Sequence, residues 1–429
     1  MRFQIEKVLL ENRQIALSEP AIDSGNLFTM LVGRNAVGKT RTISKIANQF
    51  VFARDGDEVI LAEDSLPEPA RVIAVSTSSF DRFPEPARIK AKRSMLRSQY
   101  YYFGLSNFRA GPYRLLSRAF AALFEDSGNY HRWRTLENIL DYVGFLPYFQ
   151  IELRRTGITY KGASINELLD EYKTLTGYPA GEMHNIDLER EVLPALEYLR
   201  AREKSKRGLS FDVDAMHRPL NNSDFEEFSR YAMPLLKSEM IKVGRLTLFD
   251  KRSKDKVLFH HSSSGQQCLL LMFFGLCGAI SNNSLICIDE PEISLHPKWQ
   301  SEFIGILQKA FSYFSGCHFI IATHSPQITS GLVADNGFIS DLEASNLIRA
   351  EAYAHKSADV QLSEIFHEPG YKNEYLIRVL LVLLSKLTKE GVLSDEERKR
   401  FRHVQQMEGR LDAGDPVIHL LNQIKMLLS

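Results

Sequence analysis

Residues 27–50 constrain the fold of this chain more than any other segment. They read as a short apolar run, LFTMLV, then the loop GRNAVGKT, then a helix-like stretch, RTISKIANQF. The loop matches the pattern G-x-x-x-x-G-K-[ST], in which backbone N–H groups and a helix N-terminus surround phosphate. A strand, a glycine loop and a helix in this order predict an α/β fold with a phosphate-binding loop. The loop residues predicted to contact the ligand are Gly33, Arg34, Asn35, Ala36, Val37, Gly38, Lys39 and Thr40.

A second stretch, LICIDEPE at residues 285–292, supplies acidic residues at the end of an apolar strand. Asp289 is predicted to hold Mg2+ together with the Thr40 hydroxyl, and Glu290 to orient and deprotonate an attacking water. Lys39 would then reach the outer phosphates of a nucleotide. A strand that ends in Asp-Glu is weak evidence alone, but paired with the phosphate loop it predicts an ATPase with ATP and Mg2+ as cofactors.

Two more motifs bear on the kind of ATPase. HHSSSGQQ precedes an apolar helix-like run, which places Ser263, Ser264, Gly265 and Gln266 at a helix start suited to an anion. HFIIATHS is another apolar strand followed by His324, which can hydrogen-bond a terminal phosphate. Taken singly, each motif is more commonly a serine cap or an ordinary loop histidine. Their order and spacing along one chain favour the functional interpretation.

Together, GRNAVGKT, SSSGQQ, LICIDEPEISLHP and IIATHS resemble the ABC-type ATPase heads of the RecF, SMC and Rad50 group and their bacterial defence relatives. The resemblance covers roughly residues 1–83 and 241–330. It implies that Ser263 and Gly265 belong to the signature motif, residues 294–297 to the D-loop, and His324 to the switch position. It also implies a homodimer of heads with two ATP molecules, each held between one phosphate loop and the partner's signature.

The chain departs from the pattern of this group in two places. The signature reads SSSGQ where transporters carry LSGGQ, and no clear Q-loop glutamine follows the strand RVIAVSTS. Ser79 and Asp81 are the candidates for that region. Because the Q-loop positions metal and water in this group, its absence is compatible with slow hydrolysis.

Composition narrows the classes of partner. The chain has 53 Lys and Arg against 53 Asp and Glu, and a pI of about 7.2. This balance excludes a histone-like or ribosomal protein, although local basic patches remain possible. No apolar run reaches the length of a membrane span, about 20 residues, and the N-terminus does not resemble a signal peptide. We therefore expect a cytoplasmic protein without a membrane partner, with its four cysteines as buried thiols.

The motifs divide the chain into four parts. Residues 84–240 form an insertion, expected to be mostly helical, that lacks the sustained heptads of a coiled-coil arm. In it, basic residues 88–97 precede Tyr100, Tyr101 and Tyr102; these could bind nucleic acid, or form a solvated helix followed by a strand. Asp212 and Asp214 are interpreted as a turn. The parts are the head's N-terminal part (1–83), the insertion (84–240), the head's C-terminal part (241–335) and a helical region for assembly or partner binding (336–429).

The C-terminal region reads as helices at 356–387, broken by EPG, followed by two more at 394–411 and 415–429. Ser394 and Asp415 are predicted helix N-caps. Residues 376–387 are more apolar than one buried helix face requires, so they either meet another subunit or pack within the chain. No D-x-D pair follows residue 330 and no HNH motif stands out, so no nuclease site is expected in this chain.

Looser motifs resemble the PtuA family, the ATPases of the Septu anti-phage system that also accompany some retrons. These motifs are STSSFDRF, KSADVQLSEIF and EPGYKNEYL. The resemblance implies higher homo-oligomers through the heads and C-terminal helices, and an HNH nuclease subunit, PtuB-like, regulated by nucleotide. Alternatives are the AriA ATPases of the PARIS system and a RecF-like DNA-repair clamp, with DNA or RNA as a further partner. A transporter subunit is disfavoured by the signature and the missing Q-loop.

Overall fold

The computed structural model describes most of the chain, with gaps. The described residues are 2–10, 13–19, 25–34, 37–52, 59–78, 81–84, 99–104, 111–126, 128–155, 188–204, 209–216, 226–238, 240–333 and 336–428. The basic residues 88–97 and a large part of the insertion, residues 156–187, lie outside the described residues.

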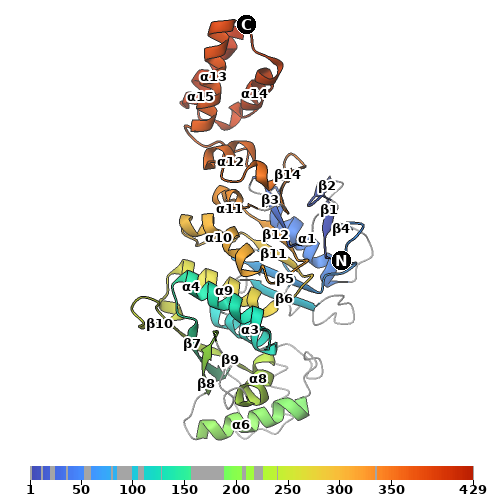
Figure 1. The fold of residues 1–429 in the computed structure, drawn as a ribbon, viewed down its shortest axis with the longest axis vertical. Helices are drawn as coiled ribbons and strands as arrows, with labels where there is room; N and C mark the ends of the chain where they lie inside the picture. The colour runs from blue at the N-terminus through green and yellow to red at the C-terminus, as the bar shows by residue number, and fades with distance from the viewer. Residues whose placement is uncertain are drawn as a thin grey trace.

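A seven-stranded sheet forms the centre of the molecule (Figure 1). Six neighbouring strands are parallel, and β14 at one edge is antiparallel to β13. Their order in space is β14 (Asn346–Arg349), β13 (Gly337–Asp341), β3 (Leu27–Val32), β12 (His318–Ala322), β11 (Leu285–Asp289), β5 (Arg71–Ser76) and β6 (Gln99–Gly104). β3, β11 and β12 are apolar almost throughout because the sheet is buried on both faces.

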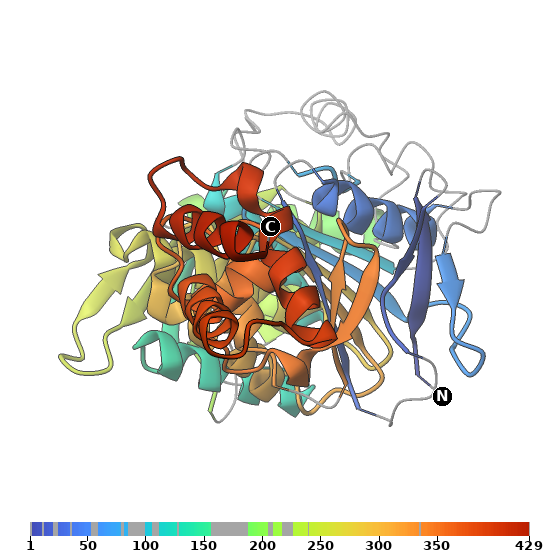
Figure 2. The same cartoon turned by 90° about the horizontal axis from the view of Figure 1, so that it is seen from above.

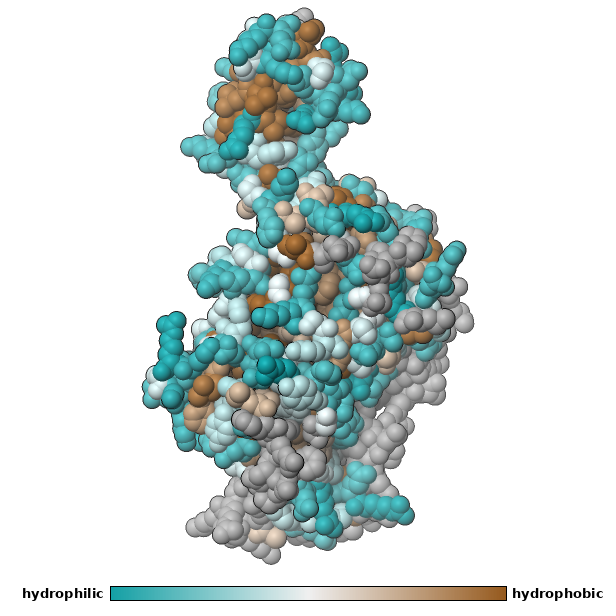
Figure 3. Space-filling model, in the orientation of Figure 1, coloured by the Kyte–Doolittle hydropathy of each residue, from teal (hydrophilic) through white to brown (hydrophobic). Residues whose placement is uncertain are grey.

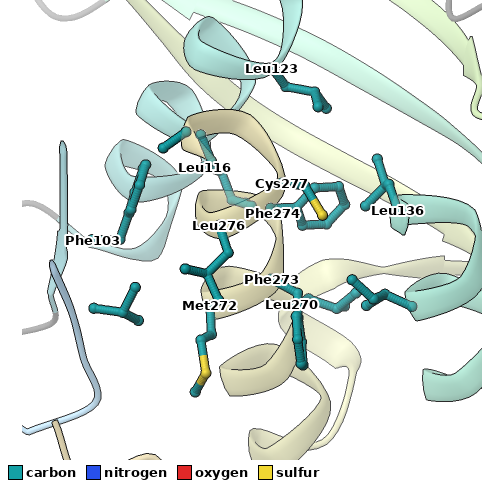
Figure 4. Packing of buried hydrophobic residues seen from close by; sticks show 14 of the residues in the cluster. Phe103, Leu116, Leu123, Leu136, Leu270, Met272, Phe273, Phe274, Leu276 and Cys277 are labelled. Carbon is teal, nitrogen blue, oxygen red and sulfur yellow. The ribbon is translucent and has the colours of Figure 1, made fainter. Parts of the chain in front are cut away.

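Each face of the sheet packs into its own apolar cluster. Helix α1 (Lys39–Val51) covers one face, where Leu31, Cys287 and Ile320 are buried. The other face carries Met30, Ile288 and Ile321. It is covered by helices α3 (Pro112–Glu125), α4 (Tyr130–Val143), α9 (Ser264–Ala279) and α10 (Pro297–Ala310). Figure 4 shows α9 at the centre of this packing, with Phe273 and Phe274 inserted among its neighbours.

Two antiparallel sheets flank the centre. One joins β2 (Arg13–Ala16), β1 (Ile5–Leu10) and β4 (Val59–Leu61). The other joins β10 (Lys256–Leu258), β9 (Ile241–Phe249), β7 (Tyr148–Arg155) and β8 (Leu209–Asp214). Beside it lie α6 (Leu193–Lys204), α8 (Met233–Lys237) and two π-helical turns, η3 (Leu188–Val192) and η4 (Phe228–Ala232).

The insertion therefore contains strands as well as helices, and one sequence interpretation there is wrong. Asp212 and Asp214 lie in strand β8, not in a turn, and the alternating burial of this strand shows why. Its apolar residues face the core while Asp212 faces outward and accepts a hydrogen bond from Gln150 Nε2 at 2.7 Å. Tyr100, Tyr101 and Tyr102 lie in β6; Tyr102 is buried and donates to Asp81 Oδ2 at 2.8 Å, so this ring packs in the core.

The C-terminal helices form a unit with its own apolar core. After α11 (Pro326–Ser330), η6 (Ala350–Ala352) and α12 (Ala358–Glu364) come α13 (Glu374–Glu390), α14 (Asp395–Gln406), η7 (Glu408–Arg410) and α15 (Pro416–Leu428). Leu380, Phe401 and Leu421 belong to a buried apolar cluster whose members all come from this unit. It lies at the opposite end of the molecule from α6 and is nearest the viewer from above (Figures 1 and 2).

The predicted caps are confirmed. Ser394 closes a capping box with Glu397, and Asp415 Oδ1 accepts from Val417 N at 2.8 Å at the start of α15. All four cysteines are free and buried, as expected.

An α/β head with a phosphate loop and a helical C-terminal region is the fold of this chain. Within the described residues, no helix has both the length and the apolar character needed to cross a membrane.

Candidate active site

The loops that follow five parallel strands meet at one edge of the sheet. In the strand register, Asp289 of β11 lies beside Ala322 of β12 and Ser76 of β5, while Leu31 of β3 lies beside Ala322. Asp341 of β13 lies beside Val32 of β3. The residues just after these positions therefore come together from distant parts of the sequence, at the carboxyl edge where open α/β sheets bind ligands.

Lys39 lies in the centre of this edge. Its ammonium donates to the carbonyl oxygens of Gly33 at 2.5 Å and Arg34 at 3.0 Å, and lies 3.0 Å from His324 Nδ1. Burial lowers the pKa of Lys39 to about 8, against the nearby charges of Glu292, Glu290 and Asp289. The left-handed backbone at Gly38, with φ of 106°, turns the chain into α1 directly before this lysine.

The contacts of His324 determine which ring nitrogen carries the proton. Nδ1 faces a Lys39 ammonium, which has only donors, so Nδ1 accepts and Nε2 bears the hydrogen. Nε2 lies 3.4 Å from Glu290 Oε1. Burial, with the charge of Lys39, lowers the pKa of His324, which favours this neutral form. His324 therefore offers an N–H donor in the direction of Glu290.

Thr40 and Asp289 form a pair suited to a divalent cation. Thr40 Oγ1 donates to Asp289 Oδ1 at 3.1 Å, while the buried Oδ2 of Asp289 has no hydrogen-bond partner among the described residues. Burial, and then Glu290, raise the pKa of Asp289 to about 7. A cation at Oδ2 would favour the carboxylate and satisfy the orphaned oxygen. Because Mg2+ usually binds one or two protein carboxylates plus phosphates and water, this donor set fits Mg2+.

The backbone of Glu290 is held in an uncommon conformation. Its φ is 51°, in the left-handed region that residues other than glycine seldom adopt. Glu290 N donates to Ala322 O at 2.9 Å, and the hydroxyl of Thr77, which follows β5, donates to Glu290 O. Anchors from the two neighbouring strands thus determine where the Glu290 side chain leaves the edge.

Glu292 is a site residue that the sequence analysis did not single out. Its Oε1 accepts from His324 N at 2.5 Å, and its buried Oε2 has no partner among the described residues. Burial raises the pKa of Glu292, and Glu292 is also the strongest of the charges that support the ammonium of Lys39. The repeated acid in DEPE was the available signal, but a sequence does not reveal that this carboxylate turns inward beneath His324.

The signature residues lie at the start of α9. Ser263 is the N-cap, and its hydroxyl and Gln266 form a capping box, with Gln266 Nε2 donating to Val143 O at 3.2 Å. Ser264 begins the helix, and Gly265 lies so close to Trp299 that an added Cβ would come within 2.5 Å of its ring. In the described residues, no hydrogen bond joins this helix start to the phosphate loop of the same chain.

The remaining predicted residues are placed as follows. Gly33, Arg34 and Val37 lie in the phosphate loop, and a Cβ added at Gly33 would approach Val37 Cγ1 to 3.1 Å. Asn35, Ala36 and Ser79 lie outside the described residues. Asp81 is bonded to Tyr102 and to Phe83 N. In the expected D-loop, Ser294 has φ of 68° and His296 caps α10.

Comparison with protein families agrees with this geometry. The model of AAA_21, an AAA domain family whose description also names an AbiEii toxin and a Type IV TA system, matches residues 28–330, more than half of the chain. The chain belongs to the AAA_21 family. As an AAA_21 member it falls within the ABC-type ATPase superfamily, which confirms that part of the resemblance. The matched range begins in β3 and ends in α11, so it contains β3, β5, β11 and β12 of the site but not β13.

Two individual proteins are similar to parts of this AAA_21 chain. The "Retron Vc95 probable ATPase" of Vibrio cholerae serotype O1 biovar El Tor is 28% identical over 114 residues, which are 26% of this chain. The match spans only 22% of the length of that curated relative. An ATP-binding cassette of an ABC transporter is 14% identical, with 85% of this chain and 98% of that chain covered and a TM-score of 0.30.

Proposed function

We propose that the chain binds ATP with Mg2+ at the carboxyl edge of the central sheet and hydrolyses it there. The convergence of Lys39, Thr40, Asp289, Glu290 and His324 from three separate segments is the observation that carries the proposal. Phosphoryl transfer requires groups of these kinds. Lys39 is the cationic group, Thr40 and Asp289 are the metal-ligand pair, Glu290 is the general base and His324 is the N–H donor. Membership of an ATPase family supports the same reading.

The contacts indicate a role for each side chain. Lys39 would exchange its loop carbonyls for phosphate oxygens, and Thr40 with Asp289 would hold Mg2+, which neutralises charge on the outer phosphates. The Glu290 carboxylate would take a proton from water as the water oxygen bonds to the terminal phosphorus and the bridging P–O bond breaks. His324 Nε2–H would donate to a terminal phosphate oxygen, with ADP and phosphate as the products.

We further propose that two heads close around ATP. Ser263 and Ser264 are exposed at the start of α9 and make no described contact with the phosphate loop of their own chain. A helix N-terminus with exposed serine side chains is suited to a phosphate brought by another molecule. This arrangement supports a homodimer in which each signature, Ser263 to Gln266, faces the partner's nucleotide.

As the biological role we propose an ATP-gated subunit of a bacterial anti-phage defence complex that regulates an HNH nuclease partner of the PtuB type. The similarity to a retron ATPase and the looser PtuA-like motifs support this role. The C-terminal helices, with a core of their own, are the proposed site of assembly. A RecF-like or AriA-like function is the alternative.

The first test is co-expression of the tagged chain with its neighbouring genes, followed by purification with and without ATP. We expect a stable complex with an HNH protein, identified by mass spectrometry and sized by light scattering. A lone dimer that forms only with ATP and retains DNA would instead support the repair clamp. A complex with a Toprim protein would support the AriA-like reading.

The chemistry is tested separately on the purified chain. Lys39→Ala should abolish ATP binding, whereas Glu290→Gln should bind ATP but release phosphate at least about 100-fold more slowly, because the general base is lost. Lys309→Ala, on the exposed face of helix α10, is the control. If Glu290→Gln turns over like the wild type, the base has been assigned to the wrong residue.

A further inference from the structure

A single carboxylate, Glu343, lies between two arginines from different parts of the molecule. Arg34 Nε, in the phosphate loop, donates to Glu343 Oε2 at 2.7 Å. Arg410 Nη2, in η7 of the C-terminal unit, donates to Glu343 Oε1 at 3.0 Å. Each carboxylate oxygen therefore serves one guanidinium, and together they form a bridge, Arg34–Glu343–Arg410, between phosphate loop and C-terminal helices.

The backbone holds Glu343 in a fixed place beside the phosphate loop. Asp341 ends β13 next to Val32, and its Oδ1 accepts from Glu343 N at 2.8 Å and Ala344 N at 3.1 Å. Leu342 N donates to Val32 O at 3.1 Å. The turn that carries Glu343 is thus bonded to the strand from which the phosphate loop emerges.

Arg410 is anchored to the same turn by a second route. Its Nη1 donates to His367 O at 2.6 Å, and the His367 ring nitrogen Nε2 lies 2.7 Å from Asp341 Oδ2. Behind Arg410, Lys425 of α15 donates to both carboxylate oxygens of Glu408 at 2.7 Å, which ties η7 to the last helix. The contacts of Arg410 therefore transmit the position of the C-terminal unit to the turn at Glu343.

On the other side, the bridge reaches the residue that would bind phosphate. The carbonyl oxygen of Arg34 accepts from Lys39 Nζ at 3.0 Å. A change in the position of Arg34 would therefore move one of the groups that holds Lys39. Within the described residues, polar contacts, linked by the short chain segment from Glu408 to Arg410 and by Arg34 itself, connect α15 to Lys39.

An isolated exposed ion pair contributes little to the stability of a fold. The geometry of the Arg34–Glu343–Arg410 bridge therefore matters more than the number of its charges. Glu343 is only 21% exposed and is shared by two guanidinium groups, of which that of Arg410 also donates to His367 O. The members of such a network act together, so the free-energy effects of substituting them one at a time do not add. We propose that Glu343 and Arg410 are positioning residues for the phosphate loop, so that the C-terminal helices influence ATP affinity. This proposal rests on the proposed function only in taking the ligand to be ATP.

The bridge has a consequence for regulation. Where two binding sites are coupled, each ligand changes the affinity for the other by the same factor. A protein that docks on the C-terminal unit and moves Arg410 would therefore change the affinity for ATP, and ATP would change the affinity for that protein by the same factor. This gives a physical route by which nucleotide state and partner binding can be coupled in one chain.

The test is equilibrium binding of a fluorescent ATP analogue, mant-ATP with Mg2+, to the full chain. Arg410→Gln removes a positive charge and loosens Glu343, and both effects act against ATP. We expect a threefold to tenfold higher Kd and a similar rise in KM, with little change in kcat. Arg34→Gln should weaken binding at least as much, and Arg410→Gln should add almost nothing in the Arg34→Gln background. Arg410→Lys should recover part of the loss.

The matched control is Lys386→Gln, which removes a positive charge and an ion pair with Glu397 within the same C-terminal unit but away from the bridge. It should bind mant-ATP like the wild type, and thermal unfolding should show that all variants are folded. If Arg410→Gln also binds like the wild type, or if its effect persists in full without Arg34, the bridge does not position the loop. Failure of the wild type to bind mant-ATP would instead contradict the proposed ATPase function.

Discussion

At the scale of single residues, Glu292 combines two tasks that a substitution can separate. Its carboxylate accepts the backbone N–H of His324 and faces the ammonium of Lys39. Glutamine at this place keeps an oxygen for the first task but loses the charge needed for the second. Glu292 therefore belongs to the candidate ATP site, although among the described residues no hydrogen bond joins its side chain to Thr40 or Glu290.

We predict that Glu292→Gln lowers kcat about tenfold and that Glu292→Ala lowers it further, because the loss of a hydrogen bond to a charged group costs about 1.5–3 kcal/mol. Steady-state phosphate release measures both. Glu351→Gln, on the exposed turn η6, is the control. Equal rates for Glu292→Gln and Glu292→Ala would mean that the orientation of His324 does not depend on this residue.

His318 makes the stability of the fold depend on pH. It is fully buried; Nδ1 accepts from Ile5 N at 3.2 Å, so Nε2 carries the hydrogen and donates to Thr29 Oγ1 at 2.9 Å. Burial lowers the pKa of His318 to about 3. Between roughly pH 6.5 and 3 the unfolded chain therefore binds a proton that the folded chain excludes, and the free energy of unfolding falls as pH falls.

We predict that this residue alone removes about 2 kcal/mol of stability between pH 6.5 and pH 5, at about 1.4 kcal/mol per pH unit. Urea unfolding at pH 7.5, 6.0 and 5.0 measures it. His318→Asn, which keeps an acceptor and a donor but does not titrate, should lose less stability over that range than the wild type. The exposed His419→Asn should behave like the wild type, and an unchanged pH dependence in His318→Asn would refute the assignment.

At the scale of elements, α9 approaches α3 unusually closely because it has glycine at the contact. A Cβ added at Gly278 would lie 2.6 Å from Ala119 O and 3.0 Å from Leu123 N, both backbone atoms that cannot rotate away. The two helices would have to separate. Figure 4 shows Leu116 and Leu123 of α3 beside α9. Because α9 begins directly after Ser263, the contact at Gly278 is one of those that hold this helix in the head.

We predict that Gly278→Ala destabilises the chain by about 1–3 kcal/mol in urea unfolding, in spite of the better helix propensity of alanine. Gly305→Ala on α10 is the matched control, because no atom lies within 4 Å of its added Cβ. That control should be neutral or stabilising by up to about 1 kcal/mol. Equal effects at both positions would show that the α9–α3 contact adapts without cost.

At the scale of the whole molecule, two features bear on assembly. The signature helix start is exposed, and exposed apolar side chains lie on the C-terminal helices, among them Leu381, Val382 and Met426. Figure 3 shows the apolar surface over this unit. The first feature gives a direct test of the proposed head dimer, because Ser263 is both a helix cap and the proposed contact to a partner's phosphate.

We predict that Glu290→Gln with ATP and Mg2+ forms a head dimer, and that adding Ser263→Asp prevents it. Aspartate is as good an N-cap as serine, so α9 is kept, but its charge would repel the partner's phosphate. Light scattering with and without ATP measures the mass. Ser394→Asp, at the capping box of α14, is the control for the cap itself. ATP-dependent dimers of the Ser263→Asp double variant would exclude the signature from the interface.

Local patterns were sufficient to predict most elements of the head. The apolar runs at 27–32, 285–289 and 318–322 are the strands β3, β11 and β12, and the glycine loop precedes α1 as expected. These signals are local, since a strand buried on both faces must be apolar throughout and a capped helix carries its cap in sequence. Asp212 and Asp214 show the limit, because acids on the outer face of an antiparallel strand look like a turn in sequence.

The sequence by itself determined that the chain has a phosphate loop, an acidic strand end and a histidine just after a buried strand, because each is a short local motif. Only the tertiary structure decided that Glu292 turns inward beneath His324, that Thr77 holds the backbone of Glu290, and that Arg410 reaches the phosphate loop through Glu343. Those contacts join residues far apart in the chain. They depend on strand order and register, which no local pattern encodes.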